Sequence, residues 1–276
     1  MPVHRINKEG TLDARFRIDM GDDSLFKRAE SGNAALPEMK TDPDLIQTAE
    51  RLMERSVFMR RPVYLDTPAG INRFHRSSVE MNMDAGKAAI QYLGRVCEIT
   101  DVVLVGVSLD NLDRADMLIQ QIRAVDSITC IRICLIDILF EPDKITDTHL
   151  TTIFSWPDFS IARPFRVEME TWLLHADNIH ANTRRITDCL NQNGIHTYAN
   201  TPLIRGVNDD PEKMVKLAQR LRRSGMEFHQ VYTSGLPIQD ALEKKIGSTP
   251  VDTRTVIQIA SKIRTDCSGR EIPLYV

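Results

Sequence analysis

Cysteine is scarce in this chain, which has five in 276 residues: Cys97, Cys130, Cys134, Cys189 and Cys267. A disulfide framework is not expected, because a domain of this length buries a sufficient core without covalent links. Only Cys130 and Cys134 lie close together, in a β-branched run that predicts a buried strand. On a strand they would be about 13 Å apart, too far to share one metal ion. The cysteines therefore predict core packing and no metal site.

An excess of charge of one sign is also lacking, since 35 Lys and Arg face 38 Asp and Glu, for a net charge of -3. Nucleic acid is therefore not an expected partner. No apolar run approaches the length of a membrane-spanning helix, and residues 1–17 contain no hydrophobic stretch of the signal-peptide kind. These absences predict a cytoplasmic protein without membrane contact.

Two nucleotide-binding motifs are missing as well: no G-x-G-x-x-G follows the first predicted strand, and the chain has no P-loop. What the chain has, from residue 62 onward, is an alternation of short apolar runs with segments of helical period. This alternation predicts an α/β fold, a partial or closed parallel barrel of six to seven units. Strands are expected at 63–67, 101–109, 130–136, 165–171, 196–204, 227–234 and 271–276, and helices at 84–96, 115–122, 147–154, 182–193, 210–224 and 252–264.

The first 60 residues differ from the rest, because they are charged, contain several glycines and prolines, and have one convincing helical pattern at 43–59. We expect residues 1–60 to form an N-terminal extension packed on a barrel domain of residues 61–276.

Polar residues follow the predicted strands, at the end of a parallel barrel where ligands bind. Asp209 and Asp210 precede Pro211, which is equally typical of a helix N-terminus. Arg205 suits a carboxylate or phosphate, and a salt bridge that closes the barrel is an equal alternative. His175, His196 and His229 lie in neighbouring units, but two of them are near strand starts, so a three-histidine metal site is disfavoured. The candidate ligand-binding residues are Asp66, Asp137, Glu170, Asn200, Arg205, Asp209 and Tyr232.

Several segments resemble, in the same order, those of the lysine 2,3-aminomutase branch of the radical S-adenosylmethionine enzymes. NTPLIRGVNDD (200–210) is similar to a family strand ending in L-L-R-G-V-N-D, and IRICLIDILFEPDKIT (131–146) to a stretch ending in P-x-R-I-T. CEITDVVLVGVSLDNLD (97–113) resembles the strand before the family's G-G-D loop. The resemblance covers about residues 62–276. It implies a radical-S-adenosylmethionine-type barrel in which Asp209 faces the distal amine of the substrate.

The departures from the family concern its chemistry. The family holds a 4Fe–4S cluster by C-x-x-x-C-x-x-C in the loop after strand one, whereas residues 67–80 contain no cysteine. The expected register places Gly70, Phe74 and Ser77 at the cysteine positions. The G-G-D loop, which contacts the methionine amine, is reduced to GVSLD (106–110), and the family's cofactor lysine lies beyond the matched segments. The resemblance thus implies that the cluster and pyridoxal phosphate are absent and that S-adenosylmethionine is not a cofactor.

Two classes of function remain. The first is a degenerate aminomutase-like pseudoenzyme that binds an active homologue, another enzyme of the pathway, or an amino-acid-like small molecule; a homo-oligomer is compatible with it. The second is an enzyme that uses the polar strand ends for cluster-independent acid–base or metal-assisted chemistry on an amino-acid derivative.

Overall fold

The computed structural model describes residues 71–75, 77–83, 85–135, 137–233, 249–269 and 272–275. Strands and helices alternate along these residues, as the hydrophobic patterns predict. The strands are β1 (Ile71–His75), β2 (Ser78–Asn82), β3 (Asp101–Val107), β4 (Cys130–Leu135), β5 (Arg166–Trp172), β6 (His196–Pro202), β7 (Glu227–Tyr232) and β8 (Leu274–Tyr275). The α-helices are α3 (Lys87–Arg95), α4 (Leu112–Arg123), α5 (Asp137–Phe140), α6 (Asp147–Phe154), α7 (Ala181–Gln192), α8 (Pro211–Arg223) and α10 (Thr253–Asp266). Short 3₁₀ helices lie at Leu109–Asn111, Pro142–Lys144 and Ala176–Asn178.

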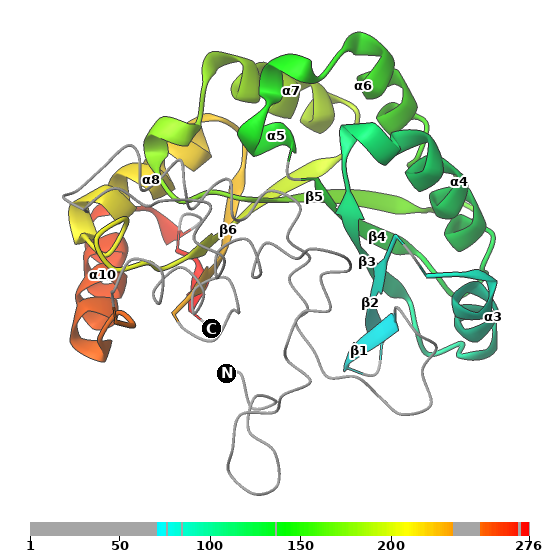
Figure 1. Ribbon diagram of the computed structural model, residues 1–276, viewed down its shortest axis with the longest axis horizontal. Coiled ribbons are helices and arrows are strands. Elements are labelled where there is room, and N and C mark those ends of the chain that lie inside the picture. The colour runs from blue at the N-terminus through cyan, green and yellow to red at the C-terminus, as the bar shows by residue number, and fades with distance from the viewer. Residues whose placement is uncertain are drawn as a thin grey trace, which may run out of the picture.

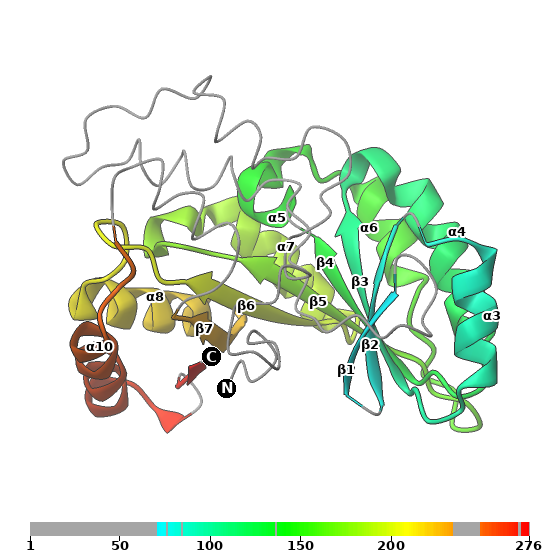
Figure 2. The same cartoon turned by 60° about the horizontal axis from the view of Figure 1, so that its bottom comes forward.

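All these strands form one sheet, in which each strand pairs with its neighbour in sequence, from β1 to β8. The pair β1–β2 is antiparallel, and β2 to β8 are parallel. The sheet curls into an arch with the helices along its outer side, as Figures 1 and 2 show from two directions. This is a half-barrel, which confirms the predicted fold class. Because the strands are parallel, their carboxyl ends meet at one rim of the arch.

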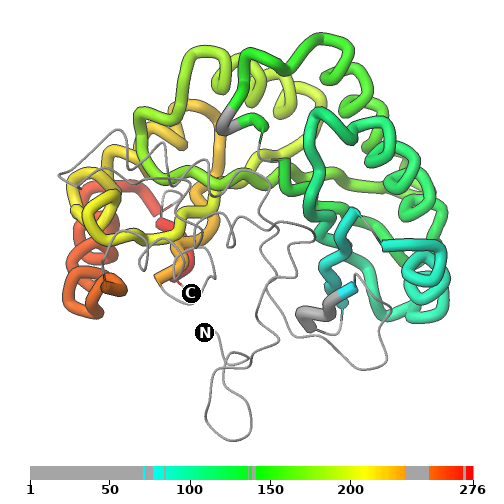
Figure 3. Tube along the Cα trace, in the orientation of Figure 1, coloured from blue at the N-terminus to red at the C-terminus, as the bar shows by residue number. Residues whose placement is uncertain are grey.

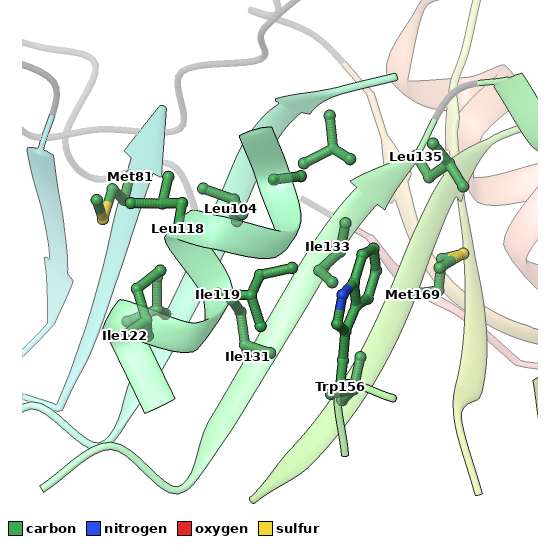
Figure 4. Close-up of a cluster of buried hydrophobic side chains, with 14 of the residues drawn as sticks. Met81, Leu104, Leu118, Ile119, Ile122, Ile131, Ile133, Leu135, Trp156 and Met169 are labelled. Carbon is green, nitrogen blue, oxygen red and sulfur yellow. The ribbon is translucent and has the colours of Figure 1, made fainter. Parts of the chain in front are cut away.

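The outer face of the sheet carries much of the apolar core. Leu118, Ile119 and Ile122 of α4 belong to one buried cluster with Ile131 and Ile133 of β4, and Figure 4 shows them facing one another. These side chains are at most 8% exposed, and full burial of each contributes about 1.5–3 kcal/mol. Since alternate residues of a strand point to opposite faces, the residues between these isoleucines face the inside of the arch.

The beginnings of α8 and α10 are each fixed by an aspartate side chain. Asp210 precedes α8 and accepts a hydrogen bond from the backbone N–H of Lys213 at 2.9 Å, with Pro211 in the first turn. Asp252 does the same for α10, through the N–H of Thr255 at 3.0 Å. The cap predicted before residue 211 is thus confirmed. Each cap satisfies one of the N–H groups that a helix start leaves without an intrahelical partner.

One expectation is wrong: residues 67–80 do not form a loop throughout. Residues 71–82 contain the hairpin of β1 and β2, in which Ile71 pairs with Met81 and Arg73 with Val79. The segment SSVEMN looks like a polar loop because one face of β2 is polar and the other apolar. Such alternation is typical of a strand with one face on the core.

The first parallel strand that the structure describes is therefore β2, which pairs with β3 from Ser78 opposite Asp101 to Asn82 opposite Val105. Only residues 83–86 connect β2 to α3. Four residues are a short strand-to-helix connection for a parallel sheet.

From β1 the chain proceeds along the arch in a single sweep, cyan to red in Figure 3. The expected extension 1–60 with its helix at 43–59, the expected strand 63–67, and the candidate residues Asp66 and Gly70 lie outside the described residues.

Candidate functional site on the inner face of the half-barrel

The register of the strands defines which side chains share the inner face. Cys134 of β4 pairs with Glu170 of β5, and Glu170 pairs with Tyr198 of β6. Two residues further along, Trp172 pairs with Asn200. Partners in a parallel ladder point to the same side, so these side chains line the concave side of β4 to β6.

A polar layer crosses the inner face in the amino-terminal half of the strands, with Arg132 of β4 at its centre. Its Nε and Nη2 atoms donate to one carboxylate oxygen of Glu168 at 3.0 and 2.8 Å. Its guanidinium lies over the Tyr198 ring, 4.8 Å from the centroid, and the Tyr198 hydroxyl lies 3.5 Å from the other oxygen of Glu168. Burial and the Glu168 charge raise the pKa of Tyr198 above its usual value. The layer thus ties three strands together through charge-assisted bonds and a cation–π contact.

His229 of β7 extends the layer to a fourth strand. Its Nε2 atom is 3.3 Å from Nη1 of Arg132, and its ring meets the Tyr198 ring edge-on with centroids 5.4 Å apart. An arginine nitrogen can only donate, so Nε2 must accept, and the imidazole is neutral in this arrangement.

Glu170 lies beside this layer and is completely buried. One of its oxygens is 3.7 Å from Nη1 of Arg132, so a single guanidinium faces two carboxylates. Removal of that cation would leave both acids on a face with little solvent, which makes Arg132 the residue on which the layer depends.

Nearer the carboxyl ends, β5 to β7 present a second inner group. The rings of Trp172 and Tyr232 lie 5.1 Å apart between centroids, and the Tyr232 hydroxyl donates to Oε1 of Gln230 at 2.5 Å. Asn200, which pairs with both Trp172 and Gln230 in the ladder, lies between them. It is completely buried, and neither its amide oxygen nor its amide nitrogen has a hydrogen-bond partner. Such groups are rare in native proteins.

The R-G-V-N-D segment after β6 forms a turn that is held largely by its own side chains. Asn208 is completely buried and donates to the carbonyls of Leu174 and Pro202 at 3.2 and 2.9 Å, while its oxygen accepts from the N–H of Ile204 at 2.8 Å. Asp209 accepts from the N–H of Gly206 at 2.9 Å, and Gly206 has the positive φ of 82° that favours glycine. Asn208 and Asp209 therefore both stabilise the turn itself.

Arg205 points from this turn to the start of α10. It donates to the carbonyl of Pro250 at 3.1 Å and lies 3.3 Å from Asp252. The salt-bridge alternative thus has direct geometric support, and a ligand role for Arg205 or Asp209 stays a prediction. Asp137, at the start of α5, accepts from the N–H of Leu109 at 2.5 Å and so links the loops that follow β4 and β3.

Of the candidates from the sequence, the structure brings Glu170, Asn200 and Tyr232 together on the inner face. Of the expected cluster positions, Phe74 lies within β1, and Ser77 lies between β1 and β2. Ser77 accepts, through its carbonyl, from the N–H of Thr100 at 2.9 Å. None of the three assigned positions falls in the connection 83–86.

The cysteines of the described residues lie apart from that connection. Cys97 is exposed, whereas Cys130 and Cys134 are buried in β4. Burial, followed by the charges of Glu168 and Asp101, raises the pKa of Cys130 to about 12, so its thiol stays protonated at neutral pH. Within the ranges that the structure describes, no cluster of three or more His, Cys, Asp or Glu side chains has the geometry of a metal site. His175 instead accepts from the N–H of Asp177.

The layer around Arg132, Glu168, Tyr198 and His229 was not predicted from the sequence, because only the polar residues at strand ends were considered there. A signal was present: Arg132 interrupts an isoleucine run, and Glu168 occupies the matching place in the next strand. Two opposite charges inside adjacent buried strands predict an ion pair.

No helix in the described ranges has both the length and the hydropathy that a membrane crossing would need.

Comparison with known proteins gives no matching family model but three relatives at low identity. A protein of Aquifex aeolicus named "Putative L-lysine 2,3-aminomutase" is 27% identical over 189 residues, 67% of this chain and 47% of the relative. L-lysine 2,3-aminomutases of Fusobacterium nucleatum and Methanococcus maripaludis are 25% and 23% identical, over 74% and 94% of this chain and 45% and 60% of their own lengths. The chain thus spans about half the length of these relatives. The similarity supports a relation of this chain to the lysine 2,3-aminomutase family.

Proposed function

We propose that this chain is an aminomutase-like protein without 4Fe–4S or radical chemistry, which binds an amino-acid-like ligand or a partner enzyme. The observation that carries the proposal is the connection between β2 and α3. It has four residues, M-D-A-G, and no cysteine, whereas the C-x-x-x-C-x-x-C motif alone spans eight residues. No cysteine precedes Cys97 anywhere in the sequence.

Ligand chemistry supports the same conclusion. Iron–sulfur clusters of this kind are held by thiolates, and the connection offers only backbone groups, a thioether and one carboxylate. Cys130 lies in the sheet as a protonated thiol. We therefore infer that the residues present do not fit the cluster, and with it S-adenosylmethionine cleavage would be lost. Pyridoxal phosphate is likewise not part of the proposed function.

The inner face supports ligand binding rather than a purely structural role. Glu170 and Asn200 are completely buried polar residues on β5 and β6, where an all-apolar lining would be more stable. Glu170 and Asn200 lie in the carboxyl-terminal halves of their strands, and parallel barrels bind their ligands at the carboxyl ends of the strands. A ligand with an amino-acid-like balance of charged and apolar groups would match acids, an amide and aromatic rings on one surface.

A second candidate is an enzyme that uses the inner face for acid–base chemistry. The inner face favours it because an imidazole, a phenol and a carboxylate, which are the usual general acids and bases, gather there. The His229 ring lies edge-on to the Tyr198 ring, and the Tyr198 hydroxyl lies 3.5 Å from Glu168. Against it, Arg132 already binds Glu168 and contacts His229, which occupies the groups that a substrate would need.

Anaerobic purification followed by iron and acid-labile sulfide analysis tests the proposal, with the Aquifex aeolicus relative prepared in parallel. We expect iron and sulfide at background in this chain. A stoichiometric 4Fe–4S cluster would refute the proposal.

The two candidates separate in a ligand screen. Lysine, ornithine and other amino acids that bind only the native state should raise the melting temperature by mass action. Turnover of any stabilising ligand by the isolated protein would replace the pseudoenzyme with the second candidate. Stabilisation without turnover supports the first.

A further inference from the structure

Asn200 stands out among the buried polar side chains of β5 to β7. It is completely buried, and both atoms of its carboxamide lack a hydrogen-bond partner. Burying an amide without partners costs free energy, and an apolar side chain of similar size would avoid this cost. A native site that keeps such a group has a hydrogen-bonding capacity that the described residues of the chain do not use.

The neighbours of Asn200 describe what this capacity suits. Trp172 and Gln230 flank it in the ladder, and the Trp172 and Tyr232 rings form a tilted pair 5.1 Å apart. Gln230 is already engaged by the Tyr232 hydroxyl. Asn200 therefore lies beside an aromatic pair and an amide that is already engaged.

We propose that Asn200 is a specificity-determining residue that binds the uncharged carboxamide or lactam edge of a planar ligand. A carboxamide offers one donor and one acceptor side by side, which together satisfy both amide atoms of Asn200. A carboxylate offers no donor for the Asn200 oxygen, and an ammonium offers no acceptor for its nitrogen. The aromatic pair would contact the flat face of the ligand.

This inference rests on the proposed binding of a small ligand at the inner face, and it names the uncharged group of that ligand that Asn200 would contact. The amide is closed to solvent in the described state, so admission of a ligand requires movement of its surroundings.

Three aromatic probes of similar size test the inference on the full chain: benzamide, benzoate and benzylamine. Their dissociation constants can be measured by ligand-observed NMR up to about 10 mM, the range expected for fragments of this size. We expect benzamide to bind at least roughly tenfold more tightly than either charged probe, because only benzamide completes both hydrogen bonds. Equal binding of the three probes, or no binding of benzamide, would overturn the inference.

The variants Asn200→Leu and Thr201→Val locate the effect. Thr201 is the adjacent residue and is also completely buried with an unpartnered oxygen, but it points to the opposite face of β6. We expect Asn200→Leu to weaken benzamide binding by roughly tenfold or more and to leave the melting temperature unchanged or higher. Thr201→Val should leave benzamide binding unchanged.

A purely structural role for Asn200 predicts the opposite pattern, a lower melting temperature with unaltered benzamide binding, and that result would sink the inference. Iron and sulfide analysis does not depend on this outcome. A failed probe experiment with no cluster present therefore contradicts the ligand class alone, whereas a cluster contradicts the proposed function.

Discussion

Asn200 and Asn208 are both completely buried at the end of the same strand unit, yet they differ in every polar contact. Asn208 uses its amide nitrogen for two carbonyls and its oxygen for a backbone N–H, whereas neither amide atom of Asn200 has a partner. The comparison separates two kinds of buried polar residue. One is needed for the turn to exist, and the other is tolerated by a fold that would be as stable without it.

The same contrast extends to the two regions around these residues. In the turn after β6, Asp209 accepts a hydrogen bond from the N–H of Gly206. Arg205 donates to the carbonyl of Pro250 and forms an ion pair with Asp252. These contacts lie within the chain itself and give each of the two residues a structural role in the turn. The inner face of the half-barrel is the region in which ligand chemistry has to be sought.

The largest effect is expected for Asn208→Ala. This substitution removes the Asn208 partner of the Ile204 N–H and of the Leu174 and Pro202 carbonyls in a buried turn. We expect a loss of about 3–5 kcal/mol in the free energy of unfolding, measured by urea denaturation. As a control, Asn193→Ala on the exposed end of α7 removes one bond to Cys189 and should cost about 1 kcal/mol or less. Equal losses in the two variants would contradict the structural role of Asn208.

A smaller effect is expected for Arg132→Leu. This substitution leaves Glu168 and Glu170, both on the inner face of β5, without the cation that lies between them and β4. Because the side chains of Arg132 and Glu168 keep 22% and 15% exposure, we expect a loss of about 2–3 kcal/mol, below that of a fully buried pair. The double variant Arg132→Leu, Glu168→Leu should recover much of this loss, since it also removes one of the unpaired acids. Additive losses, seen by the same denaturation, would show that the two residues do not interact.

The inner face also predicts a pH dependence through Cys130. Its folded pKa of about 12 lies above the ordinary value of 9.0, so folding favours the protonated thiol. This stabilisation is fully present below pH 9 and is lost as the pH rises from 9 towards 12. The melting temperature of the wild type should therefore fall more steeply between pH 9 and pH 12 than that of Cys130→Ala. Parallel curves for the two proteins would contradict the burial of this thiol.

The smallest effect is expected for Arg205→Ala. Its side chain is 40% exposed and that of Asp252 is 54% exposed, and exposed pairs contribute about 0–1 kcal/mol. Denaturation of Arg205→Ala should show a loss within this range that shrinks further in high salt. A loss comparable to that of Asn208→Ala would mean that Arg205 holds the turn more firmly than its contacts indicate.

Much of the fold could be predicted from the sequence, because strands such as β3 and β4 are buried apolar runs and helices such as α8 have a clear period and a cap at Asp210. The hairpin of β1 and β2 could not, since β2 has one polar face and resembles a loop. For the candidate site, the polar residues at strand ends included Glu170, Asn200 and Tyr232, which the structure places on the inner face. Their role in ligand binding stays a prediction. The central layer needs the register between strands that are far apart in sequence, and the lack of partners for Asn200 becomes visible only when every neighbouring atom is placed.

The central claim of the proposed function is that this chain cannot assemble a 4Fe–4S cluster that cleaves S-adenosylmethionine. Its most direct test is incubation of the iron- and sulfide-reconstituted protein with S-adenosylmethionine and a strong reductant, with the Aquifex aeolicus relative as the reference. Our account predicts no 5′-deoxyadenosine above the level of a protein-free control. Formation of 5′-deoxyadenosine by this chain would contradict it.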